Sequence, residues 1–396
     1  MKKQILLMIA TILFLTSCAE TPDEVKEDMS SYRNSQSSVS DKNSQFSYIK
    51  VSELKNNADI ALKKDYGQFS VSDKINFIQP DSVNIMEFSD VVGFGENAKE
   101  AMPYFLSESL IDLVIDSPDT SNGNYIFRNE EEKIHYGVGD DGFIAMLKPQ
   151  TFDISFSNKQ PVVKVYHANR NDDLSDEYEL NDGTCSVQEA VDYIDNWLDT
   201  EYKKLSPDFD YNVNTVVVRE YNDKYLFQII TEATYEGVHI DNFTRQPKIQ
   251  NGHQTGKMAY SDYGIEIQMV NKNSIDSFTN LSGIYIPSVK ETVQEVISME
   301  SALSFCEKTF TDFKDVEISD IRIMYTLQPV YNTDKETMIG EKDVEVTGYS
   351  SRPVWEIIMD VPPEFLPENR INTRGDLRKY IYIDMITGEY YYCFDI

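Results

Sequence analysis

Two amphipathic helix patterns, which begin after Ser186 and Ser298, limit most strongly how this chain can fold. In both patterns, apolar residues recur at helical offsets of three, four, seven and eleven. They are Val187, Ala190, Val191, Ile194 and Leu198 in the first, and Met299, Ala302, Leu303, Cys306 and Phe310 in the second. Glu189 completes a capping box with Ser186, whereas Ser301 stands at the matching position of the second copy. Each pattern predicts a helix that buries one face, and the second helix has the weaker cap.

Strand-like segments follow both helix patterns in the same order. Residues 226–232 resemble residues 354–360, and residues 265–269 resemble residues 381–385. All four segments alternate in part between apolar and polar residues, as half-buried strands do. One similar segment would carry little weight, but three in one order indicate an internal repeat. We therefore predict two related units, each with one helix on an antiparallel sheet.

The second copy ends in a tight turn at Thr387-Gly388, where glycine supplies the positive φ that a hairpin turn needs. Its capped helix, the segment 353–356 around Trp355, and the hairpin Asp384-x-x-Thr387-Gly388-Glu389 resemble the PepSY-like group of extracytoplasmic domains. The resemblance implies one helix on a small antiparallel sheet, and a binding or peptidase-regulating role without a shared catalytic residue. In the first copy, Asn271-Lys272-Asn273 replaces Thr-Gly-Glu, so that turn must differ.

The amino-terminal residues have the layout of an export signal. Lys2 and Lys3 precede an apolar run, residues 5–15, that is too short to span a bilayer. The following Leu15-Thr16-Ser17-Cys18 resembles the lipobox, which is read by the enzymes that attach diacylglycerol to a cysteine and cleave before it. We therefore expect lipidation at Cys18. The alternative is an ordinary secretory signal in which Cys18 is incidental. The whole layout also resembles an uncharacterised lipoprotein family of clostridial bacteria (Firmicutes), from which no function can be transferred.

The mature chain is expected to be anchored in the cell membrane and to face outward. Acyl chains on Cys18 would anchor it stably, and the polar residues that follow would form a flexible tether. The net charge is −31, and removal of Lys2 and Lys3 gives −31 − 2 = −33. So acidic a chain is repelled by phosphates, which excludes nucleic acid as a partner. The acidic charge is typical of solubility outside the cell, although a basic partner or divalent cations are alternatives.

The predicted fold class is α+β, with a mixed first half joined to the two repeat units. The boundaries are a signal peptide at 1–17, a tether at 18–45, an N-terminal α+β domain at 46–180, a first helix-on-sheet unit at 181–290, and a second, PepSY-like unit at 291–396. In the first half we expect helices at 52–64 and 99–115, and strands at 69–71, 75–78, 83–88, 125–128, 134–138 and 143–147. Residues 169–184 are polar and acidic, which predicts a linker.

Motifs with recognisable chemistry are weak. The run Gly137-x-Gly139-x-x-Gly142 matches a dinucleotide fingerprint, but a strand follows it and two aspartates lie within it. The loop 93–98 precedes a helix, but Glu96 stands where a phosphate would approach. None of the four histidines has zinc spacing, and no Gly-x-Ser-x-Gly elbow occurs. A triad of distant residues stays open. We expect no cofactor and no metal.

Three further groups of residues could carry a function. The acidic residues between Asp172 and Asp182 could hold calcium, but their spacing favours a solvated linker. Export would permit a Cys185–Cys393 disulfide, whereas Cys306 is predicted to lie in the core. Tyrosines crowd the carboxyl end of a chain that has 25 of them. Alternation along a strand would place some of these on an exposed strip, and the predicted binding residues are Tyr382, Tyr390 and Tyr392. Ordinary sheet packing is the alternative.

These features together predict a non-catalytic, membrane-anchored extracytoplasmic lipoprotein that binds an envelope protein or peptide and regulates it. Anchoring at Cys18, the repeat, and the lack of a catalytic motif support this interpretation. One alternative is an envelope hydrolase whose site is assembled from distant residues. Another is a solute- or glycan-binding lipoprotein that uses the tyrosine-rich surface.

Overall fold

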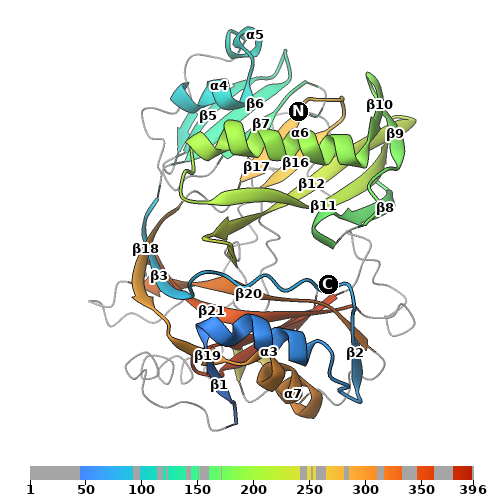
Figure 1. The fold of residues 1–396 in the computed structure, drawn as a ribbon. Coiled ribbons are helices and arrows are strands. Elements are labelled where there is room, and N and C mark those ends of the chain that lie inside the picture. The colour runs from blue at the N-terminus through green and yellow to red at the C-terminus, as the bar shows by residue number, and fades with distance from the viewer. Residues whose placement is uncertain are drawn as a thin grey trace. The chain divides into compact units, whose positions relative to one another are not determined.

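The structure is a computed structural model, and it shows a mixed α+β protein made mostly of strands (Figure 1). It describes residues 45–91, 99–113, 119–121, 124–139, 144–149, 151, 160–170, 172–240, 248–250, 253–255, 265–280, 285–309, 316–331, 346–360 and 378–394. The predicted signal, the lipobox Leu15-Thr16-Ser17-Cys18, nearly all of the tether and the loop 93–98 lie outside these residues. Within them, no helix combines the length and the apolar character that a membrane crossing needs.

One long antiparallel sheet carries the first repeat helix, α6 (Val187–Thr200). Each strand in it pairs with the next in the order β8, β11, β12, β16, β17, β7, β6, β5 and β4. Their bounds are, in the same order, Val162–His167, Asp210–Tyr221, Lys224–Tyr235, Glu266–Met269, Ser277–Asn280, Ile144–Leu147, Ile134–Gly139, Asn124–Asn129 and Asp119–Ser121. Helix α6 lies across this sheet (Figure 1).

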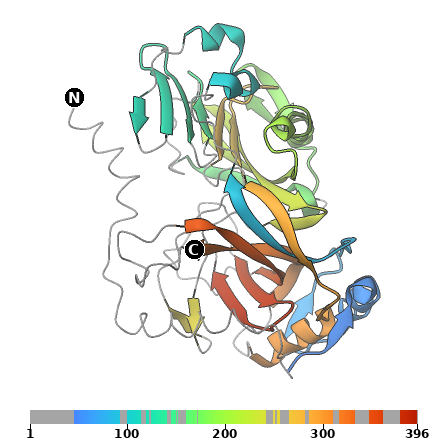
Figure 2. The same cartoon turned by 90° about the vertical axis from the view of Figure 1, so that its left-hand side faces the viewer.

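A second set of strands lies beside helices α3 (Leu54–Ala61) and α7 (Met299–Thr309). Its antiparallel order is β18 (Tyr285–Thr292), β3 (Asn84–Val91), β21 (Val346–Asp360), β22 (Arg378–Asp384) and β23 (Tyr390–Phe394). Strand β20 (Val316–Tyr331) runs parallel to both β2 (Phe69–Val71) and β13 (Val238–Ile240). Figure 2 shows β3 and β18 running side by side as a ribbon.

Short elements complete the description. β1 (Tyr48–Lys50) pairs with β19 (Glu295–Ile297), β9 (Glu177–Leu180) with β10 (Gly183–Ser186), and β14 (Lys248–Gln250) with β15 (His253–Thr255). Helices α4 (Met102–Phe105) and α5 (Glu108–Ile111) stand where one helix was predicted. The backbone adopts an extended conformation at Leu106, and this break separates the two helices. Single-turn 3-10 helices occur at Val51–Glu53, Ala168–Arg170 and Tyr202–Lys204.

The two predicted repeat helices are present. The Ser186 hydroxyl accepts a hydrogen bond from the Glu189 backbone amide, and the Glu189 carboxylate accepts one from the Ser186 amide, so the capping box is confirmed. All five predicted apolar positions of α6 are buried. In α7 the predicted residues from Met299 to Cys306 are buried, and Phe310 lies outside the described residues.

Strands of the first half pair with strands of the second half, where a separate domain at 46–180 was predicted. Strand β7 pairs with β17, β8 with β11, β3 with β18 and β21, and β2 with β20. Residues 42–328 and 348–396 accordingly form one compact unit. Residues 75–78 form no strand, and the predicted linker at 169–184 contains the β9–β10 hairpin. Hydrogen bonding to distant strands decides these points, and local composition does not reveal it.

The strands after the two repeat helices pair antiparallel, but their registers differ by two residues. Phe227 on β12 lies opposite Met269, and Trp355 on β21 lies opposite Ile383. The residue after each aromatic accepts a hydrogen bond of 2.6 Å from an arginine Nε: Gln228 from Arg219, and Glu356 from Arg322. By this register Met269 corresponds to Ile383, whereas the sequence comparison matched it with Met385. The pairing therefore displaces the predicted match of residues 265–269 with 381–385 by two residues. Both following turns contain a residue with positive φ, Gly388 at +74° and Asn273 at +55°.

Candidate functional site

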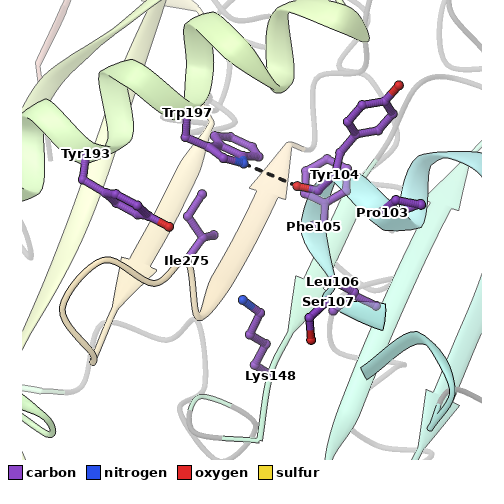
Figure 3. A pocket seen from close by; sticks show the side chains of 9 residues that line it. All are labelled: Pro103, Tyr104, Phe105, Leu106, Ser107, Lys148, Tyr193, Trp197 and Ile275. Atoms are coloured by element: carbon purple, nitrogen blue, oxygen red, sulfur yellow. Dashed lines mark hydrogen bonds between the residues drawn. The ribbon is translucent and has the colours of Figure 1, made fainter. Parts of the chain in front are cut away.

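A pocket lies where α6, the α4–α5 connection, the end of β7 and the turn before β17 meet (Figure 3). It encloses about 230 Å³. Its walls are aromatic and aliphatic, with one lysine among them. The lining residues are Pro103, Tyr104, Phe105, Leu106, Ser107, Lys148, Tyr193, Trp197 and Ile275. Most of the surface that these residues leave accessible in the pocket is polar, because apolar side chains such as Phe105 are buried.

Helix α6 supplies one wall of the pocket. Tyr193 and Trp197 are four residues apart on this helix, so they lie on one face, beside the stripe that packs on the sheet. The Trp197 ring is held by Phe105 and Phe278, whose centroids lie 5.8 and 5.6 Å from it. Its indole nitrogen donates to the Tyr104 carbonyl at 3.4 Å. These contacts fix the ring, so the wall is formed before any ligand arrives.

Lys148 follows β7 and places its ammonium in the pocket (Figure 3). Its backbone amide donates to the Asp276 carbonyl at 3.0 Å, which fixes the start of the side chain. Among the described residues, the ammonium has no hydrogen-bond or ion-pair partner. Burial lowers the pKa of Lys148, and the charge of Asp276 partly opposes that change.

The Asp276 carboxylate is committed to the turn in which it lies. One oxygen accepts from the Val270 and Asn271 amides at 2.9 and 3.0 Å. The other accepts from the Asn271 side chain at 3.1 Å and from the Ser274 hydroxyl at 2.8 Å. Asp276 therefore acts on Lys148 only through its field.

Tyr193 contributes a hydroxyl group to the lining of the same pocket. Burial raises the pKa of Tyr193, and the charge of Asp276 raises it further. The phenol consequently stays protonated at neutral pH and can donate a hydrogen bond. The pocket thus offers an ammonium, a phenol and a rigid indole face.

The predicted tyrosine strip is not an exposed surface. Tyr382 is only 1% exposed and packs among Met324, Val354 and Ile358. The ring of Tyr390 is partly buried and lies 4.8 Å from that of Phe305 on α7. The side chain of Tyr392 lies outside the description. The face of the sheet that carries Tyr382 is covered, and alternation along a strand cannot reveal this.

The acidic cluster and the cysteines, which the sequence offered as further candidates, make contacts that stabilise the fold. Asp176, in the acidic cluster, accepts from Lys164 at 2.6 Å and from the Tyr166 hydroxyl at 2.5 Å. Asp172 accepts from the His167 amide at 2.8 Å. No group of residues in the described ranges could hold a metal ion. Cys185 is a free, buried thiol, so it forms no bridge with Cys393, and Cys306 is buried as predicted.

A buried charge cluster joins β12, β20 and β21. Arg322 donates to Glu232 at 2.7 Å and to Glu356 at 2.6 Å. His239 lies 3.3 Å from Glu232. Burial alone would raise the pKa of Glu232, but Arg322 and His239 lower it to about 2. Because both carboxylates bind the same guanidinium, we interpret the cluster as structural.

His135 on β6 is expected to make the protein lose stability in acid. Burial, followed by the charge of Arg128, lowers the pKa of His135 to about 4. The unfolded chain binds the proton near pH 6.5, so this contribution is complete above that pH and is lost as pH falls through about 4. The loss should be about 3 kcal/mol. Urea unfolding at several pH values should give a flatter profile between pH 6.5 and 4 for His135→Gln. An unchanged slope would contradict the assignment.

The sequence offered a partial signal for this pocket. Tyr193 and Trp197 are large aromatic residues on α6 that do not belong to its buried apolar stripe. Their position outside the stripe could have indicated a binding role. Lys148 follows a short strand and has no local signature. It enters the pocket because β7 pairs with β17, more than a hundred residues later in the chain.

The fold is that of a mixed α+β protein with a large antiparallel sheet. It is similar to the crystal structure of an uncharacterized protein from Eubacterium rectale, with a TM-score of 0.50 and 17% sequence identity. The match covers 85% of this chain and 98% of that one. At this identity the likeness concerns the fold alone. Neither the family models nor the curated proteins gave a match.

Proposed function

We propose that the chain is a lipid-anchored extracytoplasmic lipoprotein that binds a protein or peptide partner without acting on it chemically. The sequence supports the anchor through Leu15-Thr16-Ser17-Cys18 and the polar stretch after it. A flexible tether would let the folded body meet partners at a distance from the membrane.

The pocket around Lys148 is the observation that carries the binding part of this proposal. Its groups suit holding a ligand, since a fixed indole supplies contact area and the ammonium and phenol supply directional polar contacts. A second candidate function, binding of a small solute, is favoured by the modest size of the pocket, about 230 Å³.

We further infer that the two helix-on-sheet units, 181–290 and 291–396, are related and that the second is PepSY-like. In both units an arginine Nε donates to the residue after the central aromatic, Gln228 after Phe227 and Glu356 after Trp355, and this supports the relation. Membership of the clostridial lipoprotein family is part of the same proposal.

Crosslinking in cells, with the acylated chain as bait, tests whether a partner exists. The expected result is capture of one specific envelope protein or peptide, and less capture when Lys148→Met is the bait. Lys63→Met is a matched control, because Lys63 is an exposed lysine. Turnover of a wall substrate without any specific capture would reject the proposal.

Replacing the lipidation residue should release the protein from the membrane. Cys18→Ala removes the thiol that would carry the acyl chains, and without them the acidic body has no affinity for anionic lipid. Fractionation should place most of the variant in the soluble fraction. Cys185→Ala should remain with the membrane, because that thiol lies in the folded body. Retention of Cys18→Ala in the membrane would contradict anchoring through this residue.

A further inference from the structure

We infer that the pocket binds a carboxylate joined to an aromatic or branched apolar group, with Lys148 and Tyr193 holding the carboxylate and Trp197 the apolar group. This chemistry is found at the carboxyl-terminal residue of a peptide and in a free organic acid. The inference rests on the proposed function, because it names the ligand class of the same pocket.

The charge balance of the pocket favours one negative charge in the ligand. Lys148 brings an ammonium into a partly buried site, where it has no direct partner among the described residues. The nearby acid, Asp276, already accepts four hydrogen bonds from its own turn. A ligand carboxylate would give the ammonium the partner it lacks, and a charge-assisted bond is among the stronger polar contacts.

The number of donors selects a carboxylate over other anions. Lys148 and Tyr193 both line the pocket, with Ile275 between them in this view, and each can donate to an oxygen of a bound carboxylate (Figure 3). A phosphate dianion would need more donors, and the field of Asp276 would oppose its second charge. A cation would be repelled by Lys148.

The lining and the volume of the pocket limit the part of the ligand that is attached to the carboxylate. The lining includes the ring of Trp197, which cannot turn away because Phe105 and Phe278 hold it, although most of the accessible lining is polar. A volume of about 230 Å³ suits one small group, such as the last residue of a peptide, and not a longer segment. Pro103 and Ser107 are exposed at the rim, where a longer chain could leave.

Calorimetry on the full chain in detergent tests the inference with four probes. They are the peptide Ala-Ala-Ala-Phe with a free carboxyl end, the same peptide as its carboxyl amide, N-acetylphenylalanine, and phenylacetate. Among these, the acids should bind, and the amide should bind about 10- to 100-fold more weakly than the free peptide, because it loses a hydrogen bond to a charged group.

Variants assign any binding to the pocket. Lys148→Met should weaken binding of the acids by a similar factor of about 10 to 100. Lys63→Met should leave it unchanged, and the urea midpoint of Lys148→Met should confirm that this variant is folded. Trp197→Leu should weaken the binding of both phenylacetate and the peptide, because both ligands place a ring on the indole.

Three results would overturn the inference. They are equal affinity for the acid and the amide, unchanged affinity in folded Lys148→Met, and no binding of any acid at about 10 mM, where even a millimolar Kd would be detected. Stronger binding of the peptide than of phenylacetate identifies a peptide end as the source, and the reverse identifies a free acid. Membrane fractionation and partner capture do not depend on these probes. A failure of the proposed function can therefore be told apart from a failure of this inference.

Discussion

Arg322→Met should lower the free energy of unfolding by about 3–5 kcal/mol, because it leaves two buried carboxylates without their counter-ion. The side chains of Glu232 and Glu356 are 13% and 3% exposed, and both bind this guanidinium. Methionine fills similar space, so the loss would come from charge and not from a cavity. Urea unfolding at pH 7 measures the effect.

The acid dependence of this variant provides an internal check. In the native protein Glu232 keeps its charge down to its pKa of about 2, so its contribution is present above pH 4.5 and is lost as pH falls through about 2. Without the arginine, burial should raise the pKa of Glu232, and its protonation would relieve part of the destabilisation. The difference from the native protein should therefore shrink in acid.

A charge-neutral background gives the matched control. Glu232→Gln and Glu356→Gln combined with Arg322→Met should recover part of the loss, because no uncompensated charge stays buried. A loss below about 1 kcal/mol for Arg322→Met alone would show that the cluster is solvated and of little structural weight.

Trp355→Ala should cost a similar amount, about 3–5 kcal/mol, through loss of packing. The ring is fully buried on β21, and its centroid lies 5.7 Å from that of Phe77. Its indole nitrogen donates to the Ile297 carbonyl at 2.8 Å, in the segment that leads into α7. Removing the ring would leave a cavity and an unpaired carbonyl together.

Trp355→Phe separates these two effects. Phenylalanine keeps most of the apolar volume but loses the donor, so the cost should fall to about 1–3 kcal/mol. Urea unfolding of both variants gives the comparison. A negligible loss in the alanine variant would be incompatible with this strand lying at the centre of the core.

Local features were readable from the sequence. The capping box needs only Ser186 and Glu189, three residues apart, and the helical stripe of α6 repeats within fourteen residues. The glycine of the last turn was equally clear, because Gly388 adopts the positive φ that its turn requires. These predictions were correct because each depends on neighbours along the chain.

The sequence did not reveal which faces of the sheet are covered or which strands pair with each other. Alternation separates the two faces around Tyr382, but only the packing of Met324 and Ile358 shows that its own face is closed. The first half of the chain has the composition of a domain of its own, yet β7 completes its sheet with β17. The residues of a strand do not by themselves specify which distant strand will pair with its edge.

The sequence by itself determined the two repeat helices, the capping box, the final turn, the α+β class and the acidic charge, since these follow from residues that are close together or from composition. Only the tertiary structure decided that Tyr382 is a core residue, that one arginine holds two glutamates, and that Lys148, Tyr193 and Trp197 line one pocket. The physical reason is that pairing between distant strands brings these groups together, and the energy of that pairing is shared over the whole sheet and is not encoded at any one position.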